Sequence, residues 1–218
     1  MTITIREPGS AITHFVAMLL AGIGALPLLI KTAATNNSGS LKAMTIFIIS
    51  MILLYGASTL YHSVNLTGKY LEFFRKIDHM MIFVLIAGSY TPICMIVLGG
   101  RLGYDLLLLI WGIAFFGMLV KAVWIKCPKW FSSIIYIAMG WVCVFVFGKL
   151  VKTLPPAAFA WLLGGGIIYT IGGVIYALKL PIFNAKHKNF GSHEIFHLFV
   201  MGGSICHFIC MYIIAPAV

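Results

Sequence analysis

Residues 106–124 read LLLLIWGIAFFGMLVKAVW, and this stretch decides the class of protein. A helix needs about 20 mostly apolar residues to cross the hydrocarbon core of a bilayer. The stretch meets that requirement, and its one charged residue, Lys121, stands near its end. The whole chain follows the same pattern: 61% of its 218 residues are hydrophobic and 9% are charged, where a soluble domain carries about 25% charged residues. The sequence therefore predicts an integral membrane protein.

Six further apolar runs flank this stretch, and short connections rich in Gly, Pro and Asn separate them. No connection is long enough to divide the chain, so we expect residues 1–218 to form one domain. The fold class that follows is an all-α membrane protein, a bundle of seven transmembrane helices. The predicted spans are Ile12–Ile30, Ala43–His62, Ile77–Leu98, Leu106–Trp124, Phe131–Gly148, Ala157–Leu178 and His193–Ile214.

The distribution of Lys and Arg predicts the orientation, because loops on the cytoplasmic side carry an excess of these residues. Ten of the 15 basic residues, Lys121 among them, fall with the N-terminus and the second, fourth and sixth connections; five fall on the other side. The N-terminus is therefore expected in the cytoplasm and the C-terminus outside. The basic residues are scattered between apolar runs rather than gathered in a patch, so we expect membrane lipids and not nucleic acid as partners.

Ionisable side chains inside a membrane are costly and mark functional sites. On the predicted topology, five such residues from distant parts of the chain reach a similar depth, near the cytoplasmic ends of their helices. They are His14, His62, Asp78, His193 and His197.

His193 and His197 share one face of a helix, with Cβ atoms about 6 Å apart, so their imidazoles can bind one metal ion. His62 lies at the matching depth and can supply a third ligand. Ser58, one turn before His62, can orient it. Asp78 can hydrogen-bond a ligand imidazole or the water on the metal. The alternative for this set is a polar network that ties helices together without metal.

The run His193–His197 also matches the H-E-x-x-H pattern of zinc proteases, in which the Glu is the general base. Glu194 has an alternative role as a carboxylate favoured by the dipole at the helix N-terminus, with Ser192 as the cap. We expect His14 to support a ligand rather than to bind the ion. His207 lies too far along the helix to share that ion, and an interhelical hydrogen bond is expected there.

Three blocks of sequence, in this order, resemble the haemolysin III-like proteins, the bacterial branch of the progestin and adiponectin receptor superfamily. The blocks are Glu7–His14 (EPGSAITH), with Ser10 where Asn is usual; Ser58–His62 (STLYH) followed by Lys76–His79 (KIDH); and Ser192–His197 (SHEIFH) followed by His207.

The resemblance covers nearly the whole chain and implies seven helices in the bacterial inner membrane, with a cytoplasmic N-terminus. It also implies a zinc ion near the cytoplasmic face, held by His62, His193 and His197, with Asp78 in contact with the water on that ion. Relatives in the superfamily are linked to hydrolysis of lipid amides, notably ceramide. The position of Glu194 is often not acidic in receptor members, which favours Asp78 as the base.

The leading hypothesis is therefore a zinc-dependent membrane hydrolase that acts on a lipid-like amide or ester. The first alternative is a non-catalytic membrane sensor or regulator in which zinc clamps two helices. The second is a cytolysin of the haemolysin type, for which the sequence shows no polar stripe that could line a pore. A lipid-sized cavity at the metal would favour the hydrolase over the regulator.

Overall fold

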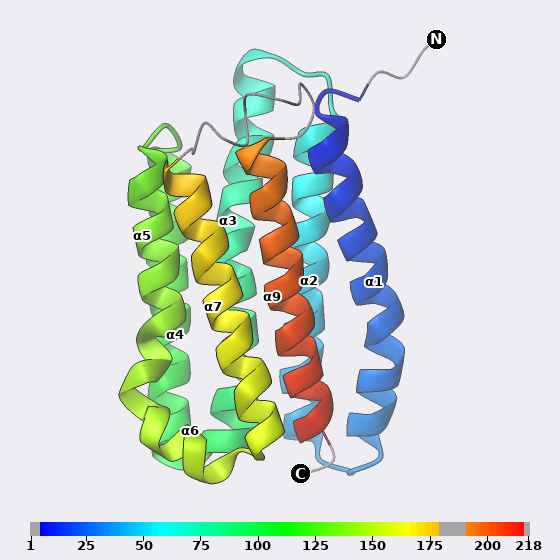
Figure 1. Ribbon diagram of the computed structural model, residues 1–218, viewed down its shortest axis with the longest axis vertical. Helices are drawn as coiled ribbons and strands as arrows, with labels where there is room; N and C mark the ends of the chain where they lie inside the picture. Colours follow the sequence, from blue (N-terminus) through cyan, green and yellow to red (C-terminus); the bar gives the residue numbers. More distant parts are fainter. Residues whose placement is uncertain (1–4, 179–190, 216–218) are drawn as a thin grey trace.

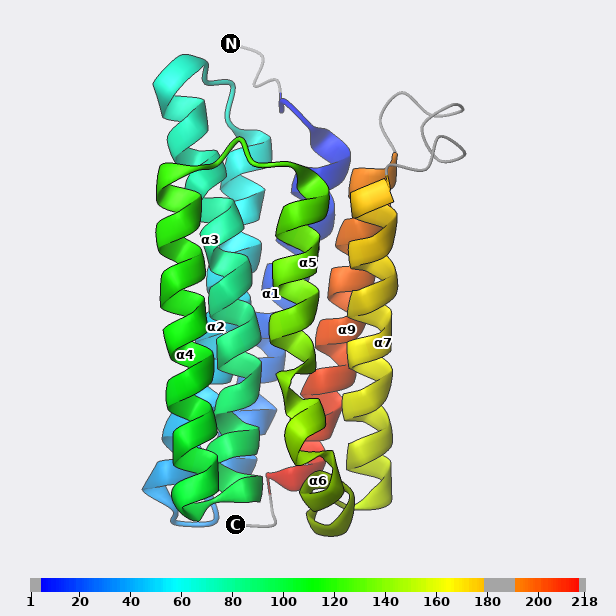
Figure 2. The same cartoon turned by 90° about the vertical axis from the view of Figure 1, so that its left-hand side faces the viewer.

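The computed structural model describes residues 5–178 and 191–215. Within these residues, seven helical stretches are long and apolar enough to cross a membrane, and they run side by side as a bundle (Figures 1 and 2). All seven predicted spans are confirmed. The helices are α1 (Pro8–Ala33), α2 (Ser38–Ser63), α3 (Gly68–Pro92) continued by η1 (Ile93–Leu98), α4 (Gly100–Val123), α5 (Lys129–Gly140) continued by η2 (Trp141–Val146) and α6 (Phe147–Thr153), α7 (Pro156–Leu178) and α9 (Ser192–Ile214).

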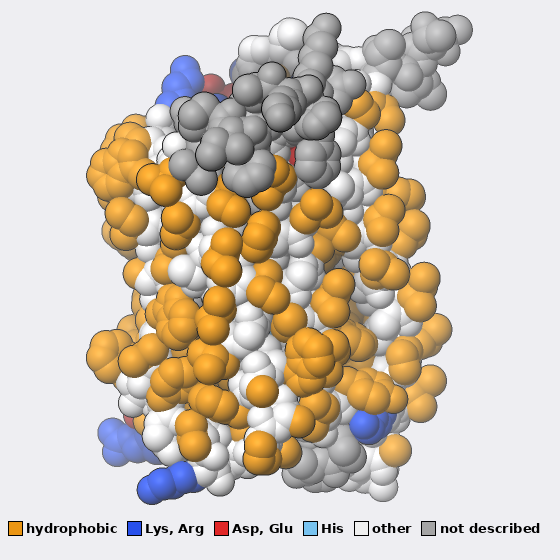
Figure 3. All heavy atoms as spheres, viewed as in Figure 1, with side chains coloured by type: hydrophobic (Ala, Val, Ile, Leu, Met, Phe, Trp, Pro, Cys, Tyr) orange, Lys and Arg blue, Asp and Glu red, His pale blue; other side chains and the backbone are white. Residues whose placement is uncertain are grey.

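The surface of the bundle is that of a membrane protein. Hydrophobic side chains cover the middle of the face in Figure 3, and Lys and Arg lie near its two ends. Large apolar side chains such as Ile23, Phe116 and Phe145 are 69%, 69% and 89% exposed. Such exposure is favourable in contact with lipid but unfavourable in water. Helix α1 begins at one end of the bundle and α9 finishes at the other (Figure 1). The assignment of the first of these ends to the cytoplasm stays a prediction from the charge distribution.

Helix α3 begins at Gly68 and not at Ile77, where the apolar run starts. The added turns are charged, and Glu72 lies 3.5 Å from Lys76 in an i,i+4 ion pair that favours a helix. Hydropathy marks the part of a helix that lies in lipid, so it does not reveal where the helix itself begins.

Two of the spans change their helical geometry part-way. Helix α3 passes into a π-helical turn after Pro92, and α5 passes into a 3-10 segment at Trp141. The Tyr90 hydroxyl donates to the Gly140 carbonyl at 2.6 Å and accepts from the Cys143 N–H at 2.9 Å. Backbone groups that lose their helical partner inside a membrane need another one, and Tyr90 supplies it where α5 changes.

Close contact between α7 and α9 depends on glycine. A Cβ at Gly172 would lie 2.6 Å from the Phe199 Cβ, and one at Gly203 would lie 2.7 Å from the Tyr169 ring. Small residues of this kind let membrane helices approach closely. Helix α9 also packs against α1, which in turn packs against α2. The beginnings of α1 and α9 therefore meet the end of α2, where the predicted histidines lie.

Candidate metal centre

His62 from α2 and His193 and His197 from α9 form a group whose candidate ligand atoms all lie within 4.8 Å of one another. His62 and His197 are only 1% and 2% exposed. The Nε2 atoms of His62 and His193 are 3.2 Å apart. Two imidazole nitrogens on a tetrahedral zinc ion, each about 2.0–2.1 Å from the metal, would lie about 3.3 Å apart. The group could therefore hold a metal ion, with one pair of nitrogens at a spacing that suits zinc, and the structure brings together the three histidines that the sequence grouped.

Glu7 orients the first of these histidines. Its Oε2 atom accepts a hydrogen bond from His62 Nδ1, and its backbone N–H donates to the His62 carbonyl at 3.0 Å. The hydrogen bond from His62 holds the pKa of the Glu7 carboxyl below its usual range, so Glu7 is ionised at neutral pH. A carboxylate can only accept, hence the His62 proton lies on Nδ1 and the lone pair of Nε2 faces the other histidines.

Thr13 orients His197 in the same way, through a hydrogen bond to Nδ1. Its hydroxyl donates to the carbonyls of Gly9 and Ser10, at 2.9 and 3.0 Å, and lies 3.3 Å from His197 Nδ1. Because the hydroxyl hydrogen is already used, its oxygen accepts from Nδ1–H, and the lone pair of His197 Nε2 is left for a metal. The His14 ring stacks on the His197 ring with centroids 3.6 Å apart and holds it in place.

Sequence reasoning assigned no role to Glu7 or Thr13. A signal was present, because Glu7, Ser10 and Thr13 are spaced by three and so share one face at the start of α1. Ser10 completes the set: its hydroxyl donates to Glu194 Oε1 at 2.6 Å. This face of α1 therefore contacts three separate residues of the site.

We expect Glu7→Ala and Thr13→Val to weaken zinc binding by about 10–100-fold each, the usual effect of removing a hydrogen-bond partner of a ligand histidine. The affinity would be measured by competition with a chromogenic chelator in detergent. Glu72→Ala is the matched control, since it removes a carboxylate that pairs with Lys76 instead. Unchanged zinc affinity in both α1 variants would contradict these roles.

Asp78, on α3, is 7% exposed and lines the same cavity as His14, His193 and His197. It is not a member of the three-histidine group, which agrees with a role beside the metal rather than on it. Ser58 also lines this cavity. Among the residues that the structure describes, the Ser58 hydroxyl and both ring nitrogens of His14 are buried and have no hydrogen-bond partner. Buried polar atoms are normally satisfied, so these unpaired groups indicate a place built for a ligand or water.

Glu194, unlike Asp78, does not face the cavity. Its Oε2 accepts from the Gly191 N–H at 2.8 Å, its Oε1 accepts from Ser10, and it is not among the residues that line the cavity. The N-cap of α9 is Gly191, one residue before the cap expected at Ser192. Both Glu194 oxygens therefore accept hydrogen bonds that stabilise the start of α9, and this geometry favours the helix-stabilising role over that of a general base.

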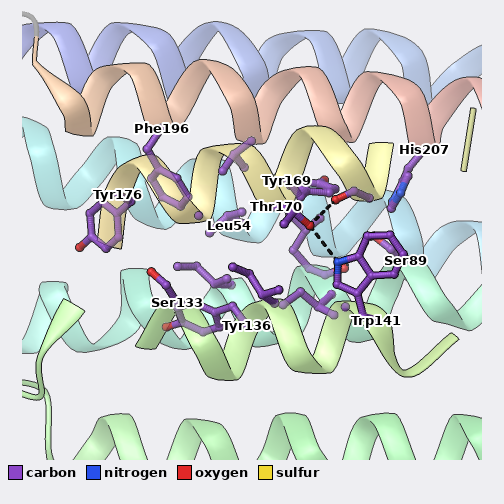
Figure 4. A pocket seen from close by; sticks show the side chains of 18 of the residues that line it. Leu54, Ser89, Ser133, Tyr136, Trp141, Tyr169, Thr170, Tyr176, Phe196 and His207 are labelled. Atoms are coloured by element: carbon purple, nitrogen blue, oxygen red, sulfur yellow. Dashed lines mark hydrogen bonds between the residues drawn. The ribbon is translucent and has the colours of Figure 1, made fainter. Parts of the chain in front are cut away.

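A cavity of about 170 Å³ extends from the histidines into the bundle between α3, α5, α7 and α9. Tyr176 and Phe196 lie at one end of Figure 4, and Trp141 and His207 at the other. His197 and His207 both line the cavity, and ten residues of helix separate them by about 15 Å. His207 Nε2 lies 3.3 Å from the Leu162 carbonyl of α7, which confirms the interhelical hydrogen bond. Most lining side chains are aliphatic or aromatic, so the cavity suits an apolar group.

Comparison with known proteins matches one family over most of the chain and more distant receptor proteins more weakly. The family model described as "Haemolysin-III related" matches residues 3–208. The chain is 39% identical to "Hemolysin-3 homolog" of Bacillus subtilis (strain 168) over 210 residues, which are 95% of this chain and 94% of the relative. It is 35% identical to "Hemolysin-3" of Bacillus cereus over 206 residues, 94% and 90% of the two chains. A more distant relative is the "Adiponectin receptor protein" of Drosophila melanogaster, 24% identical over 93% of this chain and 49% of the relative.

These matches agree with the resemblance seen in the three sequence blocks, and the seven apolar helices agree with a protein that crosses a bacterial membrane several times. The chain belongs to the haemolysin-III family of multi-pass membrane proteins.

Proposed function

We propose that this protein is a zinc-dependent hydrolase of a lipid-like amide or ester. The observation that carries the proposal is that His193 and His197, two members of the three-histidine group, line a mainly apolar cavity. The cavity, at about 170 Å³, is comparable with an apolar cavity of about 150 Å³ that binds benzene, so it can take a hydrocarbon group.

Each part of the site has its own role in the proposed reaction. A zinc ion held by His62, His193 and His197 would supply Lewis acidity that polarises a carbonyl and activates water. Asp78 is the carboxylate that faces the cavity, and it accepts the proton of the attacking water and returns it to the leaving amine or alcohol. The apolar walls bind the hydrocarbon part of the substrate and exclude bulk water from the reacting bond.

A regulator with a structural zinc ion needs the three histidines but has no use for a cavity beside them, or for unpaired polar groups such as Ser58 and His14 in its wall. The cavity therefore favours the hydrolase. The cytolysin alternative is supported only by the names of the two Bacillus relatives.

The proposal is tested by filling the cavity. Gly166 lines it and Gly164 does not, and a Cβ at either position would have no atom within 4 Å. We expect Gly166→Leu to occupy part of the cavity and to weaken substrate binding by about 1–3 kcal/mol, the effect of a methylene more or less in an apolar pocket, or about 5–150-fold. Gly164→Leu is the matched control and should change nothing.

Turnover would be measured with zinc-loaded protein on a panel of N-acyl amides and esters of increasing chain length, with zinc content determined for each variant. Zinc-loaded wild-type protein that hydrolyses no member of the panel would overturn the hydrolase. Equal activity of Gly166→Leu and Gly164→Leu would show that the substrate does not use this cavity.

A further inference from the structure

A second cluster of reactive side chains lies at the same end of the bundle, away from the histidines. Lys121, near the end of α4, is 2% exposed, although the charge distribution counted it with the loop residues. Its Nζ donates a hydrogen bond to the Ser132 hydroxyl on α5. It also donates to the Sγ atom of Cys127, which lies in the connection between α4 and α5, at 3.1 Å. The Ser132 hydroxyl is itself 3.2 Å from the same sulfur.

A buried ammonium needs a compensating negative charge. No carboxylate of the described residues lies within ion-pair distance of Lys121. The one acidic group in hydrogen-bond contact with Nζ is the Cys127 thiol, which forms a thiolate on ionisation. Burial opposes this ionisation, but the hydrogen bonds from Ser132 and Lys121 outweigh it and lower the pKa of Cys127.

We propose that Lys121 and Cys127 form a redox-modifiable pair, in which a hydroperoxide oxidises the sulfur and the lysine nitrogen then bonds to it as a sulfenamide. The thiolate is the nucleophile in such oxidations, and a sulfenic acid can condense with a nitrogen. The contact of 3.1 Å between Nζ and Sγ places the two atoms for this reaction.

The steps balance with hydrogen peroxide as the oxidant. The thiolate sulfur attacks one peroxide oxygen, the O–O bond breaks, and the Lys121 ammonium gives a proton to the departing hydroxide. The products are a sulfenic acid, a neutral amine and one water. The amine then attacks sulfur, the S–O bond breaks, and the hydroxide leaves with an amine proton as a second water. Sulfur loses two electrons, peroxide gains them, and the protein loses two hydrogen atoms.

The position of the cluster gives the modification a consequence. Ser133, next to Ser132, lines the cavity together with Tyr136, and the Lys121 Nζ lies 5.8 Å from the Tyr136 ring centroid. A bond between Lys121 and Cys127 would tether the end of α4 to the connection that leads into α5. It would thereby restrict the part of α5 that borders the cavity.

Cys143 is the internal control, because it is half-buried and its hydrogen-bond partners among the described residues are the Gly140 carbonyl at 3.6 Å and the Tyr90 hydroxyl, and no lysine. The purified, folded protein in detergent would be treated with a graded series of hydrogen peroxide and analysed by peptide mass spectrometry. We expect a cross-linked pair of peptides that contains Lys121 and Cys127 and has lost two hydrogens. Dithiothreitol should reverse it, and Cys143 should react later.

Lys121→Arg keeps the positive charge but supplies a poor nucleophile. We expect this variant to stop at a Cys127 sulfenic acid, which dimedone captures, with no cross-link. Wild-type protein in which Cys127 stays reduced while Cys143 is oxidised would overturn the proposal. So would oxidised Cys127 that never links to Lys121.

Discussion

Asp78→Asn is expected to keep zinc in the protein and to lower turnover by about a hundred- to ten-thousand-fold, the usual contribution of a positioned base. Asn has the shape of Asp and still hydrogen-bonds water, but it cannot accept a proton at neutral pH. Asp78 does not belong to the three-histidine group, so zinc binding should be unaffected. Steady-state rates and zinc content would be measured on the same preparation.

Glu194→Gln is the companion variant. Both Glu194 oxygens accept hydrogen bonds at the start of α9, so its loss should cost about 0.3–1 kcal/mol of helix stability and little activity. An inactive Glu194→Gln beside an active Asp78→Asn would reverse the assignment and make Glu194 the base, as in zinc proteases. If neither variant loses function while removal of zinc does abolish it, the ion is structural and the protein is a regulator.

The double variant His193→Ala, His197→Ala is expected to lower the thermal stability of the protein in detergent. The three histidines join α2 to α9, so a bound ion stabilises the folded state only. At free zinc a thousand times above Kd, this stabilisation is about 4 kcal/mol. At about 2–4 °C per kcal/mol for a chain of this size, Tm should fall by about 8–16 °C.

Treatment with a strong chelator distinguishes the contribution of the metal to stability from that of side-chain packing. It should lower the Tm of the wild-type protein by a similar amount and leave the double variant unchanged. His207→Ala is the matched control, because it removes another buried α9 histidine and its hydrogen bond to Leu162 but should keep the response to chelator. A wild-type Tm that does not respond to zinc removal would contradict a metal that joins the two helices.

The number and order of the helices could be predicted because apolar length alone makes a membrane span. The change in helical geometry at Trp141 could not, because it is accompanied by tertiary hydrogen bonds between Tyr90 and the backbone of α5 and η2. The burial of Lys121 could not be predicted from the sequence either. A lysine at the end of an apolar run is typical of a cytoplasmic loop, and its burial depends on Ser132 and Cys127, which a turn brings back against it.

In the candidate site, His193 and His197 followed from helical spacing, and His62 and Asp78 from their depth on the predicted topology. Glu7 and Thr13 were missed because their spacing shows that they share a face of α1 but not that this face contacts α2 and α9. For Glu194 the local pattern allowed two roles. The hydrogen bond from Ser10, a residue 184 positions away, is what favours one of them.

The zinc content of the purified protein tests the central claim most directly. Metal analysis of the wild-type protein and of the double variant His193→Ala, His197→Ala, purified side by side, would measure it. The account predicts one zinc per wild-type chain and none in the variant. A wild-type protein without zinc after exposure to it, or full zinc occupancy in the variant, would contradict the metal centre built by His62, His193 and His197.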